Sequence, residues 1–163
     1  MVQQTKRVPI DSTITQGFAS IDYVDCYSAT IHNSETVDQW VSRLFASPSW
    51  VSKLLGFRDA LVRRFGLKTQ DKATINISDH YAPGERAVLF TVIARSENEI
   101  VMGEQDKHLN FRVSVLVSEQ QGRRVVHLTT IVHYNNIWGR LYFLPVKPFH
   151  QVIVAASVRK ATQ

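Results

Sequence analysis

The stretch LNFRVSVLVSEQQGRRVVHLTTIVHY, which runs from Leu109 to Tyr134, decides the fold. Apolar and polar residues alternate on both sides of Gln121-Gly122, and a period of two is typical of β-strands with one buried face. A glycine supplies the positive φ that a two-residue hairpin loop requires. With the loop at this point, Leu109 faces Tyr134, one side of the hairpin is almost wholly apolar, and the more polar side carries both histidines. A register slip of one residue would bury those histidines, so the pattern predicts a single pairing.

Alternating segments before this hairpin extend the predicted sheet. Turn-forming clusters such as Ala82-Pro83-Gly84 separate them, and short loops between successive strands imply an antiparallel meander. A further strand is expected at Tyr23–Ile31, which is rich in aromatic and β-branched residues. The expected strands of the meander are Ala73–Ser78, Arg86–Arg95, Glu99–Gln105, Leu109–Ser118 and Arg124–Tyr134.

A charged turn precedes the Leu109 strand. A two-residue loop at Asp106-Lys107 would place Met102 opposite Phe111. It would also place Glu104 on the apolar face, opposite Leu109, where a carboxylate is costly unless it is hydrogen-bonded or at the wet end of the sheet. Glu104 is therefore a candidate acid, base or hydrogen-bond anchor at a cavity mouth. The alternative is an ordinary solvated turn.

The outer face of the sheet has an apolar patch of its own. The Arg86–Arg95 strand is apolar on both faces, so side chains from it would lie partly exposed on the outside. Such a patch is typical of a lid or a subunit interface, and we predict a homodimer through the outer sheet face. The patch comprises Val88, Phe90, Val92, Val101, Leu116 and Ile131.

Helical spacing occurs in three places. A first helix begins after Ser34 or Thr36, either of which can cap it, and buries an apolar face that ends at Phe45. A second starts at Ser47-Pro48 and continues to Phe65. A third, terminal helix begins after Asn136, and its two prolines should kink it or restart it near the second one. Its apolar stripe contains Ile137, Leu141, Leu144, Phe149, Val152, Ile153 and Ala156, and the prolines are Pro145 and Pro148.

This order of elements predicts an α+β helix-grip fold: a strand, two short helices, an antiparallel meander, and a long C-terminal helix packed across the curved sheet. We expect a single domain over residues 1–163, with residues 1–20 as an irregular or extended lead-in and residues 21–163 as the helix-grip domain. The length of 163 residues and the 44% hydrophobic and 20% charged residues agree with one domain that has a core.

Several segments resemble an uncharacterised bacterial family of the START-like, polyketide-cyclase-like (SRPBCC) superfamily. They are PSWV at 48–51, LLGFRD at 54–59, DKHLNFRVS at 106–114, VHYNN at 132–136, and the stretch from Gly139 to His150. The resemblance covers most of the chain from Tyr23 onward. It implies a cavity between sheet and terminal helix that often holds an apolar ligand; some members are cyclases or hydratases, and others only bind or transfer. It carries over no catalytic residue, because the family's function is unassigned.

The leading hypothesis is binding or carriage of a small apolar or amphipathic molecule between the sheet and the C-terminal helix. One alternative is a cofactor-independent cyclase, hydratase or isomerase that uses Glu104 with Tyr134 or Tyr142 for proton transfer. The other is a protein-interaction subunit without a ligand. Residues near the start of the terminal helix combine apolar bodies with polar groups, which suits a pocket wall as well as an ordinary core. The candidate ligand-binding residues are Glu104, Met102, Phe111, Tyr134, Trp138, Tyr142 and Arg140.

Composition excludes several classes of site. The single cysteine, Cys26, excludes an intrachain disulfide and a Cys-based zinc cage, and no His-x-x-x-His pair occurs among six histidines. We therefore expect no metal and no cofactor. No apolar run approaches the roughly 18 residues that cross a bilayer, which predicts a cytoplasmic protein without a transmembrane segment.

Net charge is +5, and most of it lies between Lys53 and Lys72, in the second predicted helix and the residues just after it. This basic face could contact a membrane surface peripherally or could simply be solvated. We expect no nucleic-acid partner, because aromatic residues are not interleaved with these charges on a strand.

Overall fold

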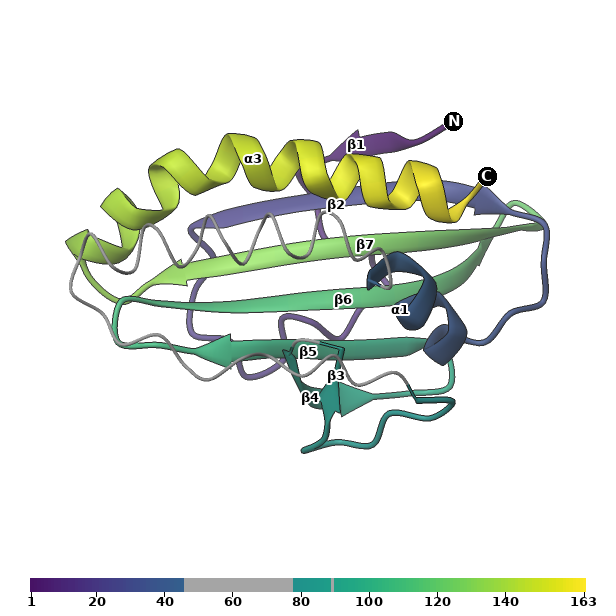
Figure 1. The fold of residues 1–163 in the computed structure, drawn as a ribbon, viewed down its shortest axis with the longest axis horizontal. Helices are drawn as coiled ribbons and strands as arrows, with labels where there is room; N and C mark the ends of the chain where they lie inside the picture. The colour runs from purple at the N-terminus through teal and green to yellow at the C-terminus, as the bar shows by residue number, and fades with distance from the viewer. Residues whose placement is uncertain (46–77, 89) are drawn as a thin grey trace.

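A seven-stranded sheet forms the centre of the computed structural model, which describes residues 1–45, 78–88 and 90–163 (Figure 1). The strand order is β1-β2-β7-β6-β5-β4-β3, and every neighbouring pair is antiparallel. The strands are β1 Gln3–Thr5, β2 Tyr23–Ile31, β3 Arg86–Ala87, β4 Phe90–Arg95, β5 Glu99–Gln105, β6 Leu109–Gln120 and β7 Arg123–Tyr134. The expected second helix and the expected Ala73–Ser78 strand lie outside the described residues, apart from Ser78.

Two described helices cover the inner face of this sheet: α1 (Val37–Phe45) and α3 (Ile137–Ala161). Thr36 caps α1 as predicted, because its Oγ1 accepts a hydrogen bond from the Gln39 backbone N at 3.3 Å while Gln39 Oε1 accepts one from the Thr36 backbone N at 2.9 Å. Helix α3 runs along the sheet above β2 and β7 (Figure 1). The α+β class and the long C-terminal helix on the sheet are confirmed, and the arrangement is consistent with a helix-grip fold.

The pairing of β6 with β7 has the predicted register. Leu109 pairs with Tyr134 and Val113 with Thr130. Gln121 and Gly122 form the loop, with φ values of 52° and 72°. Two successive positive φ angles match the right-handed twist of the flanking strands, which keeps this long hairpin in one register.

The pairing of β5 with β6 is displaced by two residues from the predicted register. Met102 pairs with Val113, and Glu104 pairs with Phe111. The predicted register is wrong because the connection is longer than two residues and closes with a hydrogen bond from the Asp106 backbone N to the Leu109 carbonyl, at 3.1 Å. A displacement of two residues keeps every side chain on its predicted face.

The segment Arg86–Arg95 is not one strand, as predicted, but two. The chain reverses after Ala87, which pairs with Phe90, and Val88 has a φ of 56°. The reversal brings Val88, Phe90 and Val92 to the inner core, and not to the outer patch where the sequence placed them. Strand alternation could not reveal this turn, since a β-branched residue rarely adopts positive φ.

The remaining outer patch is covered by the N-terminal segment. Ile14 is completely buried against Val101 and Ile131. Leu116 is also buried on this side. The apolar surface that motivated the homodimer prediction is therefore occupied within the chain.

A buried carboxylate anchors this N-terminal segment. Glu99 accepts hydrogen bonds from Ser12 Oγ at 2.5 Å, from Thr13 N and Oγ1 at 2.7 Å each, and from Ser114 Oγ at 2.5 Å. Four donors around one buried carboxylate offset the cost of removing it from water.

Replacement of Glu99 by alanine should therefore destabilise the protein. The substitution leaves the partly buried donors on Ser12 and Thr13 and the buried donor on Ser114 without this acceptor, which typically costs about 1–3 kcal/mol. Urea unfolding measures the change. The exposed neighbour Glu97→Ala is the matched control, and equal stability of the two variants would contradict the anchoring role.

Helix α3 is continuous through Pro145 and Pro148, so the expected restart does not occur, although the helix curves over the sheet (Figure 1). Both prolines lie on exposed positions, where the carbonyl groups that lose their helical partner are accessible to solvent. Most of the predicted apolar stripe points to solvent. The face on the sheet instead buries Gly139, Phe143, Val154, Ser157, Val158 and Ala161.

On the outer face, His127 is buried between two hydroxyl groups. Its Nδ1 lies 2.7 Å from Ser28 Oγ and its Nε2 lies 2.9 Å from Ser118 Oγ. Burial lowers the pKa of this imidazole, and the nearby Asp11 carboxylate opposes the shift. The folded protein therefore holds His127 neutral at a pH where the unfolded chain would protonate it.

Stability should fall as the pH drops below about 6.5, the ordinary histidine pKa, because protons then favour the unfolded chain. A His127→Gln variant should lose that part of the pH dependence. Thermal unfolding at a series of pH values tests this, with the exposed His32→Gln as control. An unchanged profile for His127→Gln would contradict the prediction.

Candidate ligand-binding site

A second buried carboxylate lies on the inner face of the sheet, beneath α3. Asp25 in β2 pairs with Thr130 of β7, and both point to the side that α3 covers. The Asp25 residue is only 1% exposed. Burial of a carboxylate at the interface between a sheet and a helix is costly, so its surroundings indicate whether the group is structural or functional.

Residues from two elements surround this carboxylate. Tyr23 Oη donates a hydrogen bond to Asp25 Oδ2 at 2.6 Å. From α3, Gln151 Nε2 donates one to Tyr23 Oη at 3.2 Å, and His150 Nε2 lies 3.4 Å from Asp25 Oδ2. We call Tyr23, Asp25, His150 and Gln151 the Asp25 cluster.

The Asp25 cluster is incompletely hydrogen-bonded within the part of the chain that the structure describes. Asp25 Oδ1 and His150 Nε2 are buried and form no hydrogen bond there. The separation of 3.4 Å between His150 Nε2 and Asp25 Oδ2 allows an ion pair but is not a hydrogen bond, so His150 Nε2 stays unsatisfied there. Ser157 Oγ, seven residues further along the buried face of α3, is also without a partner. Buried polar atoms are normally paired, so three of them beneath one helix make this region the candidate site.

The phenol of Tyr23 is held in its protonated form. Burial and then the hydrogen bond to Asp25 raise its pKa well above the usual tyrosine range. Further along β2, burial and the charge of Asp25 raise the pKa of Tyr27 to about 12. Tyr23 is thus a permanent donor that holds one oxygen of Asp25 and leaves the other available.

An apolar wall adjoins this polar group. The Tyr23 ring packs edge-on against Phe143 with centroids 4.9 Å apart, and Tyr134 lies 5.8 Å from Phe143 on the other side. Lys147 Nζ lies 5.1 Å from the Tyr23 ring centroid. The same apolar cluster includes Val132, with Leu109, Phe111, Tyr134 and Val146 packed against it. A carboxylate beside aromatic rings suits a molecule that has one polar and one apolar end.

Two of the residues predicted from the sequence belong to this region. Phe111 and Tyr134 both pack against the cluster of Tyr23 and Phe143. Burial and the charge of Asp22 raise the pKa of Tyr134, while Arg140 lowers it. Tyr134 therefore keeps its proton close to the Asp25 cluster.

The other predicted site residues lie elsewhere. Glu104 is on the inner face but in β5, three strands away from β2, and its Oε1 accepts hydrogen bonds from Thr91 N at 3.3 Å and Thr91 Oγ1 at 3.2 Å. Met102 is fully buried in the main core. On α3, Trp138 is 57% exposed, Arg140 is exposed and Tyr142 is half-buried.

The charged turn after Glu104 holds the start of α3. Asn136 Nδ2 donates to the Lys107 carbonyl at 2.9 Å, and the Asn135 backbone N donates to the His108 carbonyl at 2.9 Å. At Gly139, an added Cβ would lie 2.0 Å from the His108 carbonyl oxygen, so only glycine allows this approach. The turn positions the helix that covers the Asp25 cluster.

Sequence reasoning missed Asp25 and His150. Asp25 stands in a strand of aromatic and β-branched residues, at a position that alternation assigns to the same face as Tyr23 and Tyr27. That isolated carboxylate at an inward position was the available signal. His150 is predicted from the sequence to be a packed or capping residue of the terminal helix, because a single histidine there has no local pattern that points to Asp25.

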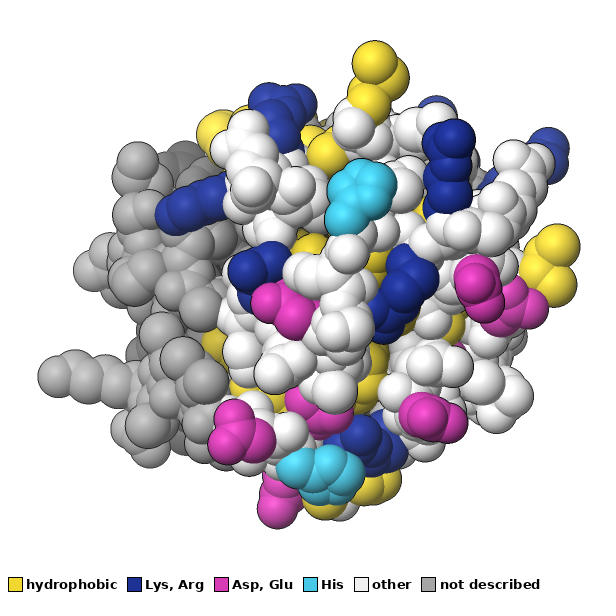
Figure 2. Space-filling view, turned by 90° about the vertical axis from the view of Figure 1, so that its right-hand side faces the viewer, with side chains coloured by type: hydrophobic (Ala, Val, Ile, Leu, Met, Phe, Trp, Pro, Cys, Tyr) yellow, Lys and Arg dark blue, Asp and Glu magenta, His cyan; other side chains and the backbone are white. Residues whose placement is uncertain are grey.

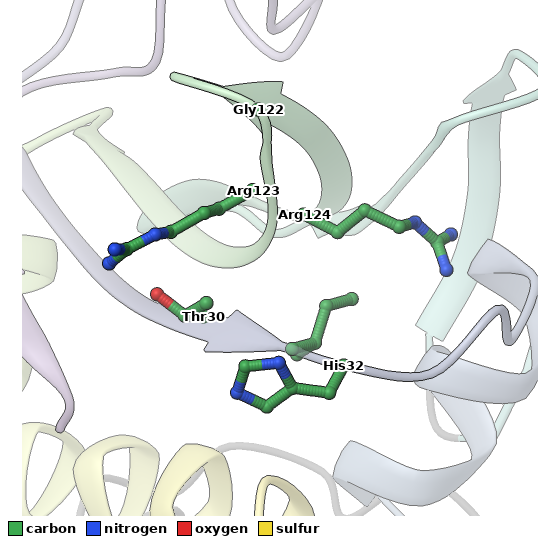
Figure 3. Close-up of a pocket in the computed structure, with 6 residues that line it drawn as sticks. Thr30, His32, Gly122, Arg123 and Arg124 are labelled. Carbon is green, nitrogen blue, oxygen red and sulfur yellow. The ribbon is translucent and has the colours of Figure 1, made fainter.

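A surface pocket of about 380 Å³ lies at the other end of β2 and has no link to this cluster. Its lining includes Thr30, His32, Arg123 and Arg124, and the two arginine side chains point in opposite directions (Figure 3). Arg124 donates hydrogen bonds to the carbonyls of Asn33 and Glu35. The arginines therefore do not converge on one anion.

Figure 2 shows no converging cluster of basic side chains on the face of the molecule that it draws. Lys and Arg side chains are scattered there among Asp, Glu and apolar groups, and do not gather into one patch. Among the described residues, no group of three or more His, Cys, Asp or Glu side chains is placed to hold a metal ion.

The fold and the Asp25 cluster together define an α+β protein in which a long C-terminal helix covers buried polar groups on an antiparallel sheet. A family model described as a protein of unknown function, DUF2867, matches residues 18–157, so the chain belongs to that family. The matched segment contains the whole Asp25 cluster. The comparison with curated proteins found no match, and neither did the comparison with solved structures.

Removal of the Tyr23 hydroxyl should destabilise the protein more than removal of the Tyr27 hydroxyl. Tyr23→Phe takes the donor from a buried carboxylate, for which about 1–3 kcal/mol is typical. Among the described residues, the hydroxyl that the matched control Tyr27→Phe removes takes part in one hydrogen bond, which it accepts from Gln4 Nε2 of β1 at 2.8 Å. Denaturant unfolding of both variants measures the difference. Equal losses would contradict the special role of Tyr23.

Proposed function

We propose that the protein binds a small amphipathic molecule between the inner sheet face and α3. The observation that carries the proposal is the buried Asp25 carboxylate, whose Oδ1 forms no hydrogen bond in the described part of the chain. A structural carboxylate is normally fully paired, as Glu99 is on the outer face. The contrast between the two residues supports a ligand-binding role for Asp25.

The surroundings of Asp25 suggest which molecule fits. An unpaired carboxylate oxygen accepts a hydrogen bond, so the polar end of the ligand is a donor such as a hydroxyl or an amine. The apolar end then packs against Phe143 and Tyr134. The resemblance to the START-like superfamily supports the same location, because it implies a cavity between sheet and C-terminal helix.

An enzyme of the cyclase, hydratase or isomerase kind is the second candidate. The 3.4 Å separation of His150 Nε2 and Asp25 Oδ2 favours it, because an imidazole and a carboxylate at this distance can share a proton. In that case the proton-transfer groups are Asp25 and His150. Glu104 then has a structural role, because it accepts hydrogen bonds that link β5 to β4.

Binding of matched probes tests the proposal. 1-Dodecanol and dodecylamine should bind at least about tenfold more tightly than dodecanoate, since a charge-assisted hydrogen bond of about 1.5–3 kcal/mol replaces repulsion between two carboxylates. Isothermal calorimetry and native mass spectrometry measure this, and the latter also detects molecules that co-purify with the protein.

Asp25→Asn should reduce that preference while the fold persists, because the amide oxygen can still accept the bond from Tyr23. The exposed Asp79→Asn is the matched control. Absence of binding for all three probes and of any co-purified ligand would refute the proposal. Turnover of a bound probe that is lost in His150→Gln would favour the enzyme instead.

A further inference from the structure

The outward face of α3 is apolar. The side chains of Leu144 and Val152 are 69% and 70% exposed, and that of Ile137 is 60% exposed. Trp138, Leu141, Pro145 and Pro148 are exposed on the same side. At 3.6 residues per turn these positions form one stripe along the helix, opposite the face that carries Phe143, His150 and Val154 on the sheet.

The charge on α3 is of one sign. The helix contains Arg140, Lys147, Arg159 and Lys160 and no Asp or Glu. All four cations lie on exposed positions. Long basic side chains can extend from an apolar stripe toward charged groups beside it, so the helix is suited to a surface that is both apolar and anionic.

By length and composition alone, α3 could also cross a membrane, and it is the one described helix of which this is true. Its packing contradicts a spanning role in this fold, because Gly139, Phe143, Val158 and other residues are buried against the sheet. A helix with one face on its own protein and an apolar, basic outer face is arranged to lie in the plane of a bilayer interface.

We propose that α3 docks the protein on an anionic lipid bilayer surface through the stripe of Ile137, Trp138, Leu141, Leu144 and Val152. Charge decides between this occupant and a second copy of the chain. Two α3 helices placed face to face would bring like charges together without any acidic partner on either helix, whereas anionic headgroups are complementary to them. Trp138 near the start of the helix suits the headgroup level, where indole rings concentrate.

Docking through α3 is distinct from the proposed ligand site, although both use the same helix. The apolar stripe lies on the solvent-facing side of α3, whereas His150 and Gln151 lie on the side that faces the sheet. A carrier that settles on a bilayer with this helix would hold its ligand site directly behind the contact surface.

Co-sedimentation with vesicles tests the docking. The full chain should bind vesicles of phosphatidylcholine with phosphatidylglycerol at least tenfold more tightly than vesicles of phosphatidylcholine alone, and added salt should weaken the binding. The double substitution Leu141→Glu and Leu144→Glu should reduce the binding at least tenfold. Because both side chains are exposed, the variant should fold, and circular dichroism checks this. Trp138 fluorescence should shift to the blue on binding, and the shift should be absent in Trp138→Phe.

Ile10→Glu is the matched control, because Ile10 is fully exposed on the N-terminal segment and lies away from α3. The Ile10→Glu variant should bind vesicles like the wild type. The Asp25→Asn variant should also bind vesicles like the wild type, although its ligand preference should change, so vesicle docking and ligand binding are tested separately. Failure of the wild type to bind anionic vesicles would overturn the inference, as would unchanged binding by the Leu141 and Leu144 variant. A molar mass in light scattering that falls from dimer to monomer in that variant, without vesicle binding, would assign the stripe to a second copy instead.

Discussion

The pairing of β6 with β7 is the constraint on which the rest of the structure depends. Twelve residues on each strand are held in one register by a two-residue loop with positive φ at Gln121 and Gly122. The register decides which side chains of the central strands face α1 and α3, and β2 then inherits the same two faces by pairing with β7. Two buried carboxylates of the sheet owe their positions to this alternation, with Asp25 on the inner face and Glu99 on the outer.

Asp25 and Glu99 are similarly buried but differently hydrogen-bonded. Glu99 is 2% exposed and saturated with donors from the N-terminal segment and β6, so it fastens that segment over the sheet. Asp25 is 1% exposed and has one firm donor, Tyr23. Residues of α3 approach it, but within the described residues Asp25 Oδ1 accepts no hydrogen bond. The difference in hydrogen bonding, and not the degree of burial, distinguishes a structural anchor from a candidate binding group.

Much of the fold was predictable because it follows from local periodicity. The strand Glu99–Gln105, the β6–β7 register and the Thr36 cap of α1 were predicted from alternation, turn residues and capping chemistry. The turn at Val88 was not, because its backbone has a conformation that valine disfavours and that packing must impose. The candidate site was harder still. Phe111 and Tyr134 were identified from the hairpin, but Asp25 and His150 are 125 positions apart, and neither has a local pattern that points to the other.

The sequence by itself determined β2, β5, β6 and β7 with the faces of their side chains, the antiparallel order of these central strands and the existence of a long terminal helix. These features depend on the period of apolar residues and on a few turn and capping residues, all of which act over short distances along the chain. Only the tertiary structure decided which face of α3 packs on the sheet, because that helix is apolar on both sides. The choice brings His150 and Gln151 over Asp25 and turns Leu144 and Val152 outward. It depends on the close approach of Gly139 to the His108 carbonyl and on the packing of Phe143 against Tyr23, contacts between residues that are distant in the chain.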